Sequence, residues 1–386
     1  MTNVEQDRTL AKISETILDT IDKAKQQETL KQNDNLKRVE NERLELLKAQ
    51  SDAHAVEAQR WRAEAQRLAK EKEDLRLHVE PAAPPGPLPS ARIESAAPLG
   101  PALIQISTEQ GGIKRVGYGW QQKTERITVS GYEQELAKGL TTTMVQIPAG
   151  SFQMGSPATE AERYEDEGPQ HRVELQSFFL GKTPVTQAQW QAVASWPQVD
   201  LKLNSDPAGF KGANRPVEQV NWGEAMEFCR RLSRRTKLSY TLPSEAQWEY
   251  ACRAGTTTPF AVGDTLTPDL ANYDGNITYG SGTEGRKRGM TTEVGSFAAN
   301  AWGLQDMHGN VWEWCLDHWH DDYRGAPSDG SAWVSGGDPE KRLLLGGSWY
   351  GDPGSCRSAI RYGWHLVSRG NDVGFRLCRF PPGLVS

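Results

Sequence analysis

A proline-rich run near residue 90 divides the chain into two parts. Residues 81–101 read PAAPPGPLPSARIESAAPLGP. Proline lacks a backbone N–H and fixes φ, so such a run favours extended polyproline conformations over helix or sheet. We therefore assign residues 81–107 to a linker rich in proline and alanine. At about 3.1 Å per residue, the extended run would hold its two ends on the order of 60 Å apart.

The part before the linker has the pattern of an amphipathic helix. Leu10, Ile13, Ile17 and Ile21 recur at spacings of three and four residues, which gives one narrow apolar seam. We predict a helical stalk, a possible coiled coil, over residues 1–80, and a homo-oligomer that forms through its first helix. The alternative is a charged helix that associates with nothing, because the heptads are not sustained.

The part after the linker contains the hydrophobic core, since 12 of the 13 tryptophans follow residue 110. Three helices are expected there, each with a capping box: Thr186 with Gln189, Asn221 with Glu224, and Ser244 with Gln247. We expect the third helix to end at Gly255 in a left-handed C-cap. Beyond residue 256 we expect loops and short strands only. The pattern predicts an α+β domain with little regular structure.

Composition and charge exclude several classes of function. The net charge is -6, so nothing draws the chain to phosphate backbones, and we expect no nucleic-acid partner. No apolar window is long enough to span a membrane, and MTNVEQDRTL lacks the order of a signal peptide, so we expect a cytoplasmic protein. The five cysteines form no CxxC pair and are expected to be reduced. Among them, Cys229 falls on the apolar stripe of a helix and is predicted to pack in the core.

Seven segments occur in an order typical of one known family. They are MVQIPAGSFQMGS (144–156), TPVTQAQW (183–190), PVEQVNWGEAMEFC (216–229), YTLPSEAQWEYACRAG (240–255), GLQDMHGNVWEWCLD (303–317), GGSW (346–349) and GFRL (374–377). With these segments the chain resembles the formylglycine-generating enzyme (sulfatase-modifying factor) family, a variant of the C-type lectin fold. The resemblance implies a C-type lectin-like domain over residues 141–386, preceded by a β extension at 108–140. It does not fix the function, because this fold serves both enzymes and ligand binders.

The oxidases of this family bind copper through two cysteines that lie five residues apart after the GGS segment. Here the second position is Cys356 and the first is Gly351. A Cu(I) centre takes a pair of soft thiolate ligands, so we expect neither copper nor catalysis, and we expect Cys356 to be a buried packing thiol. The alternative is an oxidase that uses Cys356, copper and oxygen to convert a substrate cysteine to formylglycine. His318 and His320 lack a third His or Cys nearby and are expected in a solvated loop.

The resemblance also implies a structural calcium ion at the GNVWEW turn. Its ligands would fall on Asp306, Gly309, Val311 and Glu313, which offer hard oxygen atoms from side chains and backbone. The alternative is that Glu313 pairs with a nearby arginine.

The C-terminal segment, residues 346–378, alternates a regular framework with irregular insertions. The framework is GGSW, CRSA, Arg361, Arg369 and GFRL. The segment resembles the variable region of proteins that retroelements diversify at the adenines of asparagine codons. Tyrosine with Ser, Gly, Asn and Asp is also typical of selected binding surfaces. We therefore predict a non-catalytic, receptor-like protein that binds a protein or other macromolecular ligand; the alternative is an ordinary terminal loop. The predicted contact residues are Tyr350, Gly351, Asp352, Gly354, Ser355, Ile360, Tyr362, Gly363, Trp364, His365, Leu366, Val367, Ser368, Gly370, Asn371 and Asp372.

Overall fold

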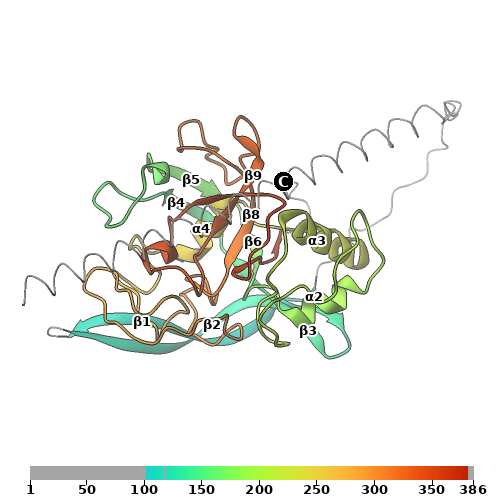
Figure 1. Cartoon of the computed structure of the whole chain (residues 1–386), viewed down its shortest axis with the longest axis horizontal. Helices are drawn as coiled ribbons and strands as arrows, with labels where there is room; N and C mark the ends of the chain where they lie inside the picture. The colour runs from blue at the N-terminus through green and yellow to red at the C-terminus, as the bar shows by residue number, and fades with distance from the viewer. Residues whose placement is uncertain (1–100, 117–118, 381–386) are drawn as a thin grey trace, which may run out of the picture. The chain divides into compact units, whose positions relative to one another are not determined.

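The computed structural model describes residues 101–116 and 119–380, which form a mostly β domain with few helices (Figure 1). The predicted stalk of residues 1–80 and residues 81–100 of the predicted linker lie outside the described residues. Within the described part, strands β1 to β12 form sheets of six, four and two strands, and helices α2, α3 and α4 accompany them. No helix in this part is long and apolar enough to cross a membrane.

The largest sheet has the strand order β1-β2-β3-β6-β12-β7. Its strands are β1 (Ile104–Val116), β2 (Gly119–Ala137), β3 (Leu140–Ile147), β6 (Phe178–Gly181), β7 (Tyr240–Thr241) and β12 (Cys378–Arg379). Strands β1 and β2 form the long hairpin drawn in cyan in Figure 1, and the second half of β2 pairs with β3. The hairpin is therefore an extension of the main sheet.

Strand β1 begins before the predicted end of the linker at residue 107. Ile104 pairs with Gly131, and Ser107 pairs with Thr128. Four residues that we assigned to the linker therefore belong to the sheet. The run IQIS alternates apolar and polar residues, as a strand does, and Ile106 packs against a core cluster behind the sheet. This short run was assigned to the linker because its pairing partner lies more than twenty residues away in the sequence.

The α-helices begin where the sequence predicts them. They are α2 (Gln187–Ala194), α3 (Trp222–Thr236) and α4 (Glu245–Arg253). The side chains of Thr186, Asn221 and Ser244 each accept a backbone N–H three residues further on, which confirms the three capping boxes. The end of α4 differs from the prediction, because Ala254 is the first left-handed residue, with φ 46°, and Gly255 follows with φ 91°.

The four-stranded sheet carries the C-terminal segment. Its order is β10 (Tyr362–His365), β9 (Asp338–Leu345), β8 (Trp312–Trp319) and β11 (Val373–Gly374). Strands β4 (Gly150–Met154) and β5 (His171–Leu175) form the small sheet, and η1 (Glu165–Glu167) and η2 (Gly354–Cys356) are short 3-10 turns. Strand β10 lies at the edge of its sheet, so one side of this strand is not paired within the sheet.

Two main clusters of buried side chains support these sheets. Met144 packs in one cluster with Phe228 of α3, whereas its neighbour Val145 packs in the other with Trp248 of α4. Adjacent residues of a strand point to opposite faces, so the main sheet has a hydrophobic cluster on each face. Cys229 is buried in the first cluster, as predicted.

Candidate ligand-binding surface

The C-terminal segment is fixed to the core by arginines that bind glutamates from distant elements. Arg357 binds Glu167 and Glu160 at 2.5 and 2.7 Å, Arg361 binds Glu245 at 2.5 Å, Arg369 binds Glu224 at 3.0 Å, and Arg376 binds Glu313 at 2.5 Å. The side chains of Arg357, Arg361 and Arg376 are completely buried. Removing one partner of such a pair leaves an uncompensated buried charge, which is strongly destabilising. The backbone of the segment is therefore held at four points.

Most of the predicted contact residues reach the surface between these points. Tyr350 is 66% exposed and Tyr362 49% exposed, and Asn371 is also exposed. A larger group is partly exposed: Gly351, Asp352, Ser355, Gly363, Trp364, His365, Leu366, Val367, Gly370 and Asp372. Side chains at the exposed positions can change without opening the core, whereas a Cβ at Gly363 or Gly370 would collide with the ring of Trp319 or Trp364.

Three of the predicted contact residues are buried and do not reach the surface. Ile360 is 4% exposed and Ser368 8% exposed, and Gly354 is buried within η2. At Gly354 a Cβ would collide with the carboxylate of Glu162. Ile360 and Ser368 directly precede Arg361 and Arg369, and the carbonyl oxygen of Gly354 accepts a hydrogen bond from Arg357. The contact residues were predicted from residue types that adenine changes in an asparagine codon can produce. Such residue types do not show whether a side chain is buried.

The exposed surface of the C-terminal segment has two groups of side chains, and the first is a row of aromatic rings. On β10, Tyr362 and Trp364 are two residues apart, so they lie on the same face of the strand. Tyr362 contacts Trp312 of β8 with ring centroids 5.6 Å apart, and Trp364 stacks on Trp314 at 6.0 Å. Stacking on the buried Trp314 fixes Trp364, while Tyr362 stays open to solvent. Rigid aromatic side chains of this kind are typical anchors in protein interfaces.

A second group of side chains adjoins the aromatic row. Trp349 donates its indole N–H to the carbonyl oxygen of Asn371 at 3.2 Å, and its ring contacts Tyr350 at 5.5 Å. Next to Asn371, the carboxylate of Asp372 accepts a hydrogen bond from Ser348 at 3.0 Å, and burial raises its pKa. The backbone of Asp372 binds Trp312, which also contacts Tyr362. Trp312 therefore connects the two groups into one surface.

Cys356 lies beneath this surface and not in it. The residue is completely buried, and its Sγ is 3.6 Å from the carbonyl oxygen of Asp352. Burial, with a contribution from the Asp352 charge, raises the pKa of the thiol. Gly351 occupies the other cysteine position of the family's copper site, and its carbonyl oxygen accepts a hydrogen bond from Asp274. The geometry suits a packing thiol and offers no second thiolate at position 351.

A buried contact between Cys252 and His308, which no sequence pattern predicted, lies nearby. The Sγ atom of Cys252 is 3.8 Å from Nε2 of His308. However, Nδ1 of His308 donates to the carbonyl oxygen of Cys356, and Nε2 accepts from Ala261. Burial raises the pKa of Cys252 to about 12 and lowers that of His308 to about 4. Both groups are neutral near pH 7, so the pair has no thiolate with which to act as a nucleophile.

At the predicted calcium site, Glu313 is already paired with other side chains. Glu313 accepts two hydrogen bonds from Arg376, at 2.5 and 2.6 Å, and one from Trp248 at 2.7 Å. This is the arginine pairing that we gave as the alternative. Asp306 keeps one buried oxygen without a hydrogen-bond partner, and Gly309 and Val311 are buried beside it in the turn.

Two tryptophans of this surface, Trp312 and Trp349, are not among the predicted contact residues. Both belong to segments that carry the family resemblance, GNVWEW and GGSW, and Trp349 also belongs to the predicted framework. Their contacts with Tyr362 and Tyr350 show that they also support the exposed residues. The sequence offers a signal only for Trp349, which directly precedes the predicted contact residue Tyr350.

Comparison with known proteins gives a consistent set of relatives. Residues 131–380 match the family model of the sulfatase-modifying factor enzyme 1-like domain. The chain is 29% identical over 312 residues to the formylglycine-generating enzyme of Mycobacterium tuberculosis, and the match covers 63% of this chain and 99% of that enzyme.

Two solved structures resemble the fold. PvdO from Pseudomonas aeruginosa has a TM-score of 0.56 and 34% identity, and the match covers 65% of this chain and 98% of that chain. Treponema denticola variable protein 1 has a TM-score of 0.55 and 26% identity, and the match covers 65% of this chain and 99% of that chain. The range matched by the family model begins within β2 and includes the whole C-terminal segment.

Proposed function

The chain belongs to the family of sulfatase-modifying factor enzyme 1-like domains, and from this premise we propose that it is a non-catalytic ligand-binding protein. Its recognition surface would be the exposed part of the C-terminal segment, from Tyr350 to Asp372. We further propose that residue types in this surface are diversified, on the C-type lectin-like fold that the family resemblance implies. The ligand would be a protein or another macromolecule.

The alternation of buried arginines with exposed side chains carries this proposal. Arg357 and Arg361 are held by glutamates of other elements, whereas Tyr350 and Tyr362 face solvent. A scaffold of this kind keeps the backbone constant while the surface residues change. Tyrosine beside small polar residues gives a large contact area at low cost in conformational entropy. The similarity to a protein named as variable, from Treponema denticola, supports the same proposal.

The stalk and the location of the protein also belong to this proposal. If residues 1–80 form a coiled coil, the recognition surfaces are linked, and binding gains from their high effective concentration. We propose a cytoplasmic homo-oligomer on this basis. Sedimentation of the full chain and of a chain without residues 1–80 tests the stalk, because a monomer in both would remove the multivalency.

The gene itself provides the decisive test of diversification. We expect the codons of the exposed insertions to be related to AAC or AAT by changes at adenine only. We also expect a near-identical template repeat in the neighbourhood of the gene, with adenines at these positions. Codons that require other changes, together with the absence of such a repeat, would refute diversification and leave an ordinary terminal loop.

The oxidase remains a second candidate because of the similarity to the formylglycine-generating enzyme of Mycobacterium tuberculosis. It would require Cu(I) bound by Cys356 and a second thiol, and oxygen consumption with a cysteine-containing peptide. Titration of the reduced protein with Cu(I), beside a Cys356→Ser control, tests this directly. Stoichiometric binding that is lost in the control would favour the oxidase over the ligand-binding protein.

A further inference from the structure

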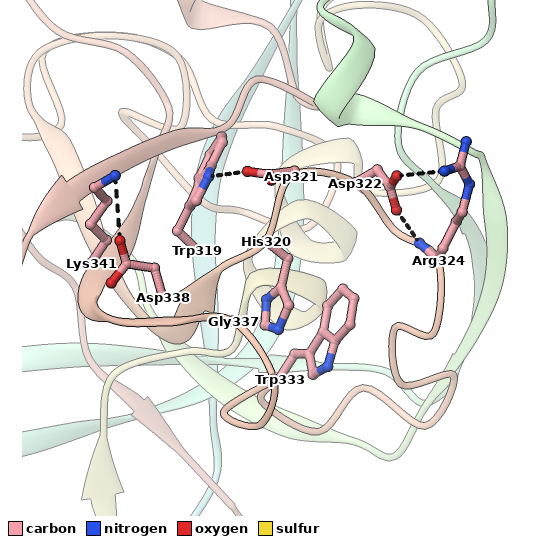
Figure 2. Close-up of a pocket in the computed structure, with 10 residues that line it drawn as sticks. Trp319, His320, Asp321, Asp322, Arg324, Trp333, Gly337, Asp338 and Lys341 are labelled. Atoms are coloured by element: carbon pink, nitrogen blue, oxygen red, sulfur yellow. Dashed lines mark hydrogen bonds and ion pairs between the residues drawn. The ribbon is translucent and has the colours of Figure 1, made fainter.

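A cavity of about 480 Å³ opens between the end of β8 and the start of β9. Figure 2 shows its lining, which includes Trp319, His320, Trp333 and a set of charged side chains. None of these residues belongs to the C-terminal segment. The volume is in the range of sites that bind small molecules. The cavity therefore differs in size and in composition from the open recognition surface.

The aromatic part of the wall is held in place from behind. The imidazole of His320 stacks on the indole of Trp333, with ring centroids 3.5 Å apart and planes within 6°. Nδ1 of His320 lies 3.1 Å from the carbonyl oxygen of His318 and Nε2 lies 3.0 Å from that of Ser335, and a neutral ring donates its one N–H to one of them. Gly337 packs against the same ring, where a Cβ would lie 2.6 Å from Cε1. The long β8–β9 connection is thus tied together at His320, and the indole is preorganised.

The polar part of the wall presents acceptors and donors side by side. Asp321 accepts the indole N–H of Trp319 at 3.0 Å. The other two aspartates pair with cations, Asp322 with Arg324 at 3.2 Å and Asp338 with Lys341 at 3.4 Å, as the dashed lines in Figure 2 show. Arg324 is largely exposed, and exposed ion pairs of this kind contribute little to stability. A ligand can therefore exchange its own hydrogen bonds for theirs at small cost.

From this lining we propose that the cavity binds a saccharide unit. An indole offers a flat apolar surface for the C–H face of a sugar ring, while the carboxylates and the two cations bind its hydroxyl groups. The near balance of opposite charges favours a neutral ligand, because a phosphate group would meet three aspartates. A metal ion does not fit, since no group of three ligating side chains is present in the described residues.

Position 363 of the C-terminal segment borders this cavity from behind. A Cβ on Gly363 would lie 2.5 Å from Cδ2 and Cε3 of the Trp319 ring, and β10 pairs with β9 along this edge. Any larger residue at position 363 must displace the indole. The site itself does not depend on the proposed diversification. Nevertheless, a change at this one position would alter the cavity as well as the recognition surface.

Saturation-transfer NMR on the full chain tests the proposal. The probes are the methyl pyranosides of glucose, galactose, mannose and N-acetylglucosamine. We expect transfer to the ring C–H protons of at least one of them. Trp333→Leu and Asp321→Asn should each weaken binding about tenfold, the loss expected for one stacking or hydrogen-bonding contact. Asp200→Asn is the matched control, because Asp200 is an exposed, ion-paired aspartate beside α3.

The outcomes separate this site from the proposed function. Asp321 is exposed, so its variant should keep the melting temperature even if Trp333→Leu loses it. Absence of transfer from all four glycosides, or equal transfer in Asp321→Asn and Asp200→Asn, would overturn the saccharide site. Tyr350→Ala lies outside the cavity and should leave the glycoside signal unchanged. Failure of the codon test would remove the diversified surface without affecting these results.

Discussion

Arg361 donates to the carboxylate of Glu245 at 2.5 Å, and both side chains are almost completely buried. Glu245 is the first residue of α4 and also accepts the hydroxyl group of Tyr323 at 2.7 Å. Arg361 directly precedes β10, the edge strand that begins with the exposed Tyr362. The start of the exposed strand is therefore fixed to a core helix by a group that no ligand can reach.

Two adjacent substitutions should differ in how much stability they cost. Arg361→Ala leaves the Glu245 charge buried without its partner, so we expect the free energy of unfolding to fall by about 3–5 kcal/mol. Tyr362→Ala removes a half-exposed ring and its two ring contacts, with Trp312 and Trp364, which should cost about 1–2 kcal/mol. Denaturant unfolding measures both values. Equal losses in the two variants would contradict the division into framework and surface.

The buried His308 should make the protein sensitive to acid. Burial lowers its pKa to about 4, whereas the unfolded value is about 6.5. Because the folded pKa is depressed, the stability from the neutral ring is complete above about pH 6.5. This stability is lost as the pH falls towards 4, and the loss is about 3 kcal/mol.

Urea unfolding of the wild type and of His308→Gln across this pH range isolates the effect. Buried carboxyl groups act in the opposite sense: burial raises the pKa of Asp317 to about 7, so its contribution is lost as the pH rises through that value. Wild type and variant share these carboxyl groups, so their contributions cancel in the difference between the two free energies of unfolding. This difference should shrink towards pH 4, and parallel curves would show that His308 does not titrate on unfolding.

The five cysteines should be unreactive in the native protein. All of them are buried and free, and the thiolate is the form that reacts with alkylating agents. We expect iodoacetamide to label none of them rapidly under native conditions and all five in denaturant, as counted by mass spectrometry. Rapid native labelling of Cys356 would instead indicate an accessible, activated thiol and would strengthen the oxidase candidate.

Calcium addition distinguishes the two roles considered for Glu313. Both of its oxygens bind Arg376, so we expect the same melting temperature in a chelator and in excess calcium chloride. A ligand that binds only the folded state would raise the melting temperature. A calcium-dependent rise that disappears in Glu313→Gln would show that the ion replaces the guanidinium as the partner of this carboxylate.

The parts of the fold that depend on residues close together in the sequence could be predicted from it. A capping box such as Thr186 with Gln189 lies within four residues, so its chemistry is visible in the sequence and reappears in the structure. The start of β1 depends on pairing between Ile104 and the distant Gly131, which a local pattern does not contain. The linker boundary was therefore placed too late.

At the candidate site, too, local motifs could be predicted from the sequence and long-range contacts could not. The GGSW and GFRL segments identified the framework, but the partners of its arginines, such as Glu167 for Arg357, lie almost two hundred residues away. Burial of Ile360 depends on that framework and was not predicted. The cavity between β8 and β9 arises from the conformation of a long connection, for which the sequence shows only a charged, histidine-containing loop.

A complete substitution scan of residues 346–378 tests how far the surface can vary. We expect Tyr350 and Asn371 to tolerate most residue types, with changes within about 0.5 kcal/mol, because their side chains face solvent. Ile360→Ala should cost about 2–5 kcal/mol, because it leaves a cavity in packed surroundings. Display of the full chain with a fold-dependent readout measures all positions together.

If Ile360 and Ser368 tolerate as much as Tyr350, these residues are open to solvent in the folded protein and the placement of the segment is wrong. If Ile360 and Ser368 tolerate few substitutions, diversification at these two positions would produce mostly unfolded variants. A diversified recognition surface would then be confined to the exposed positions between the arginines.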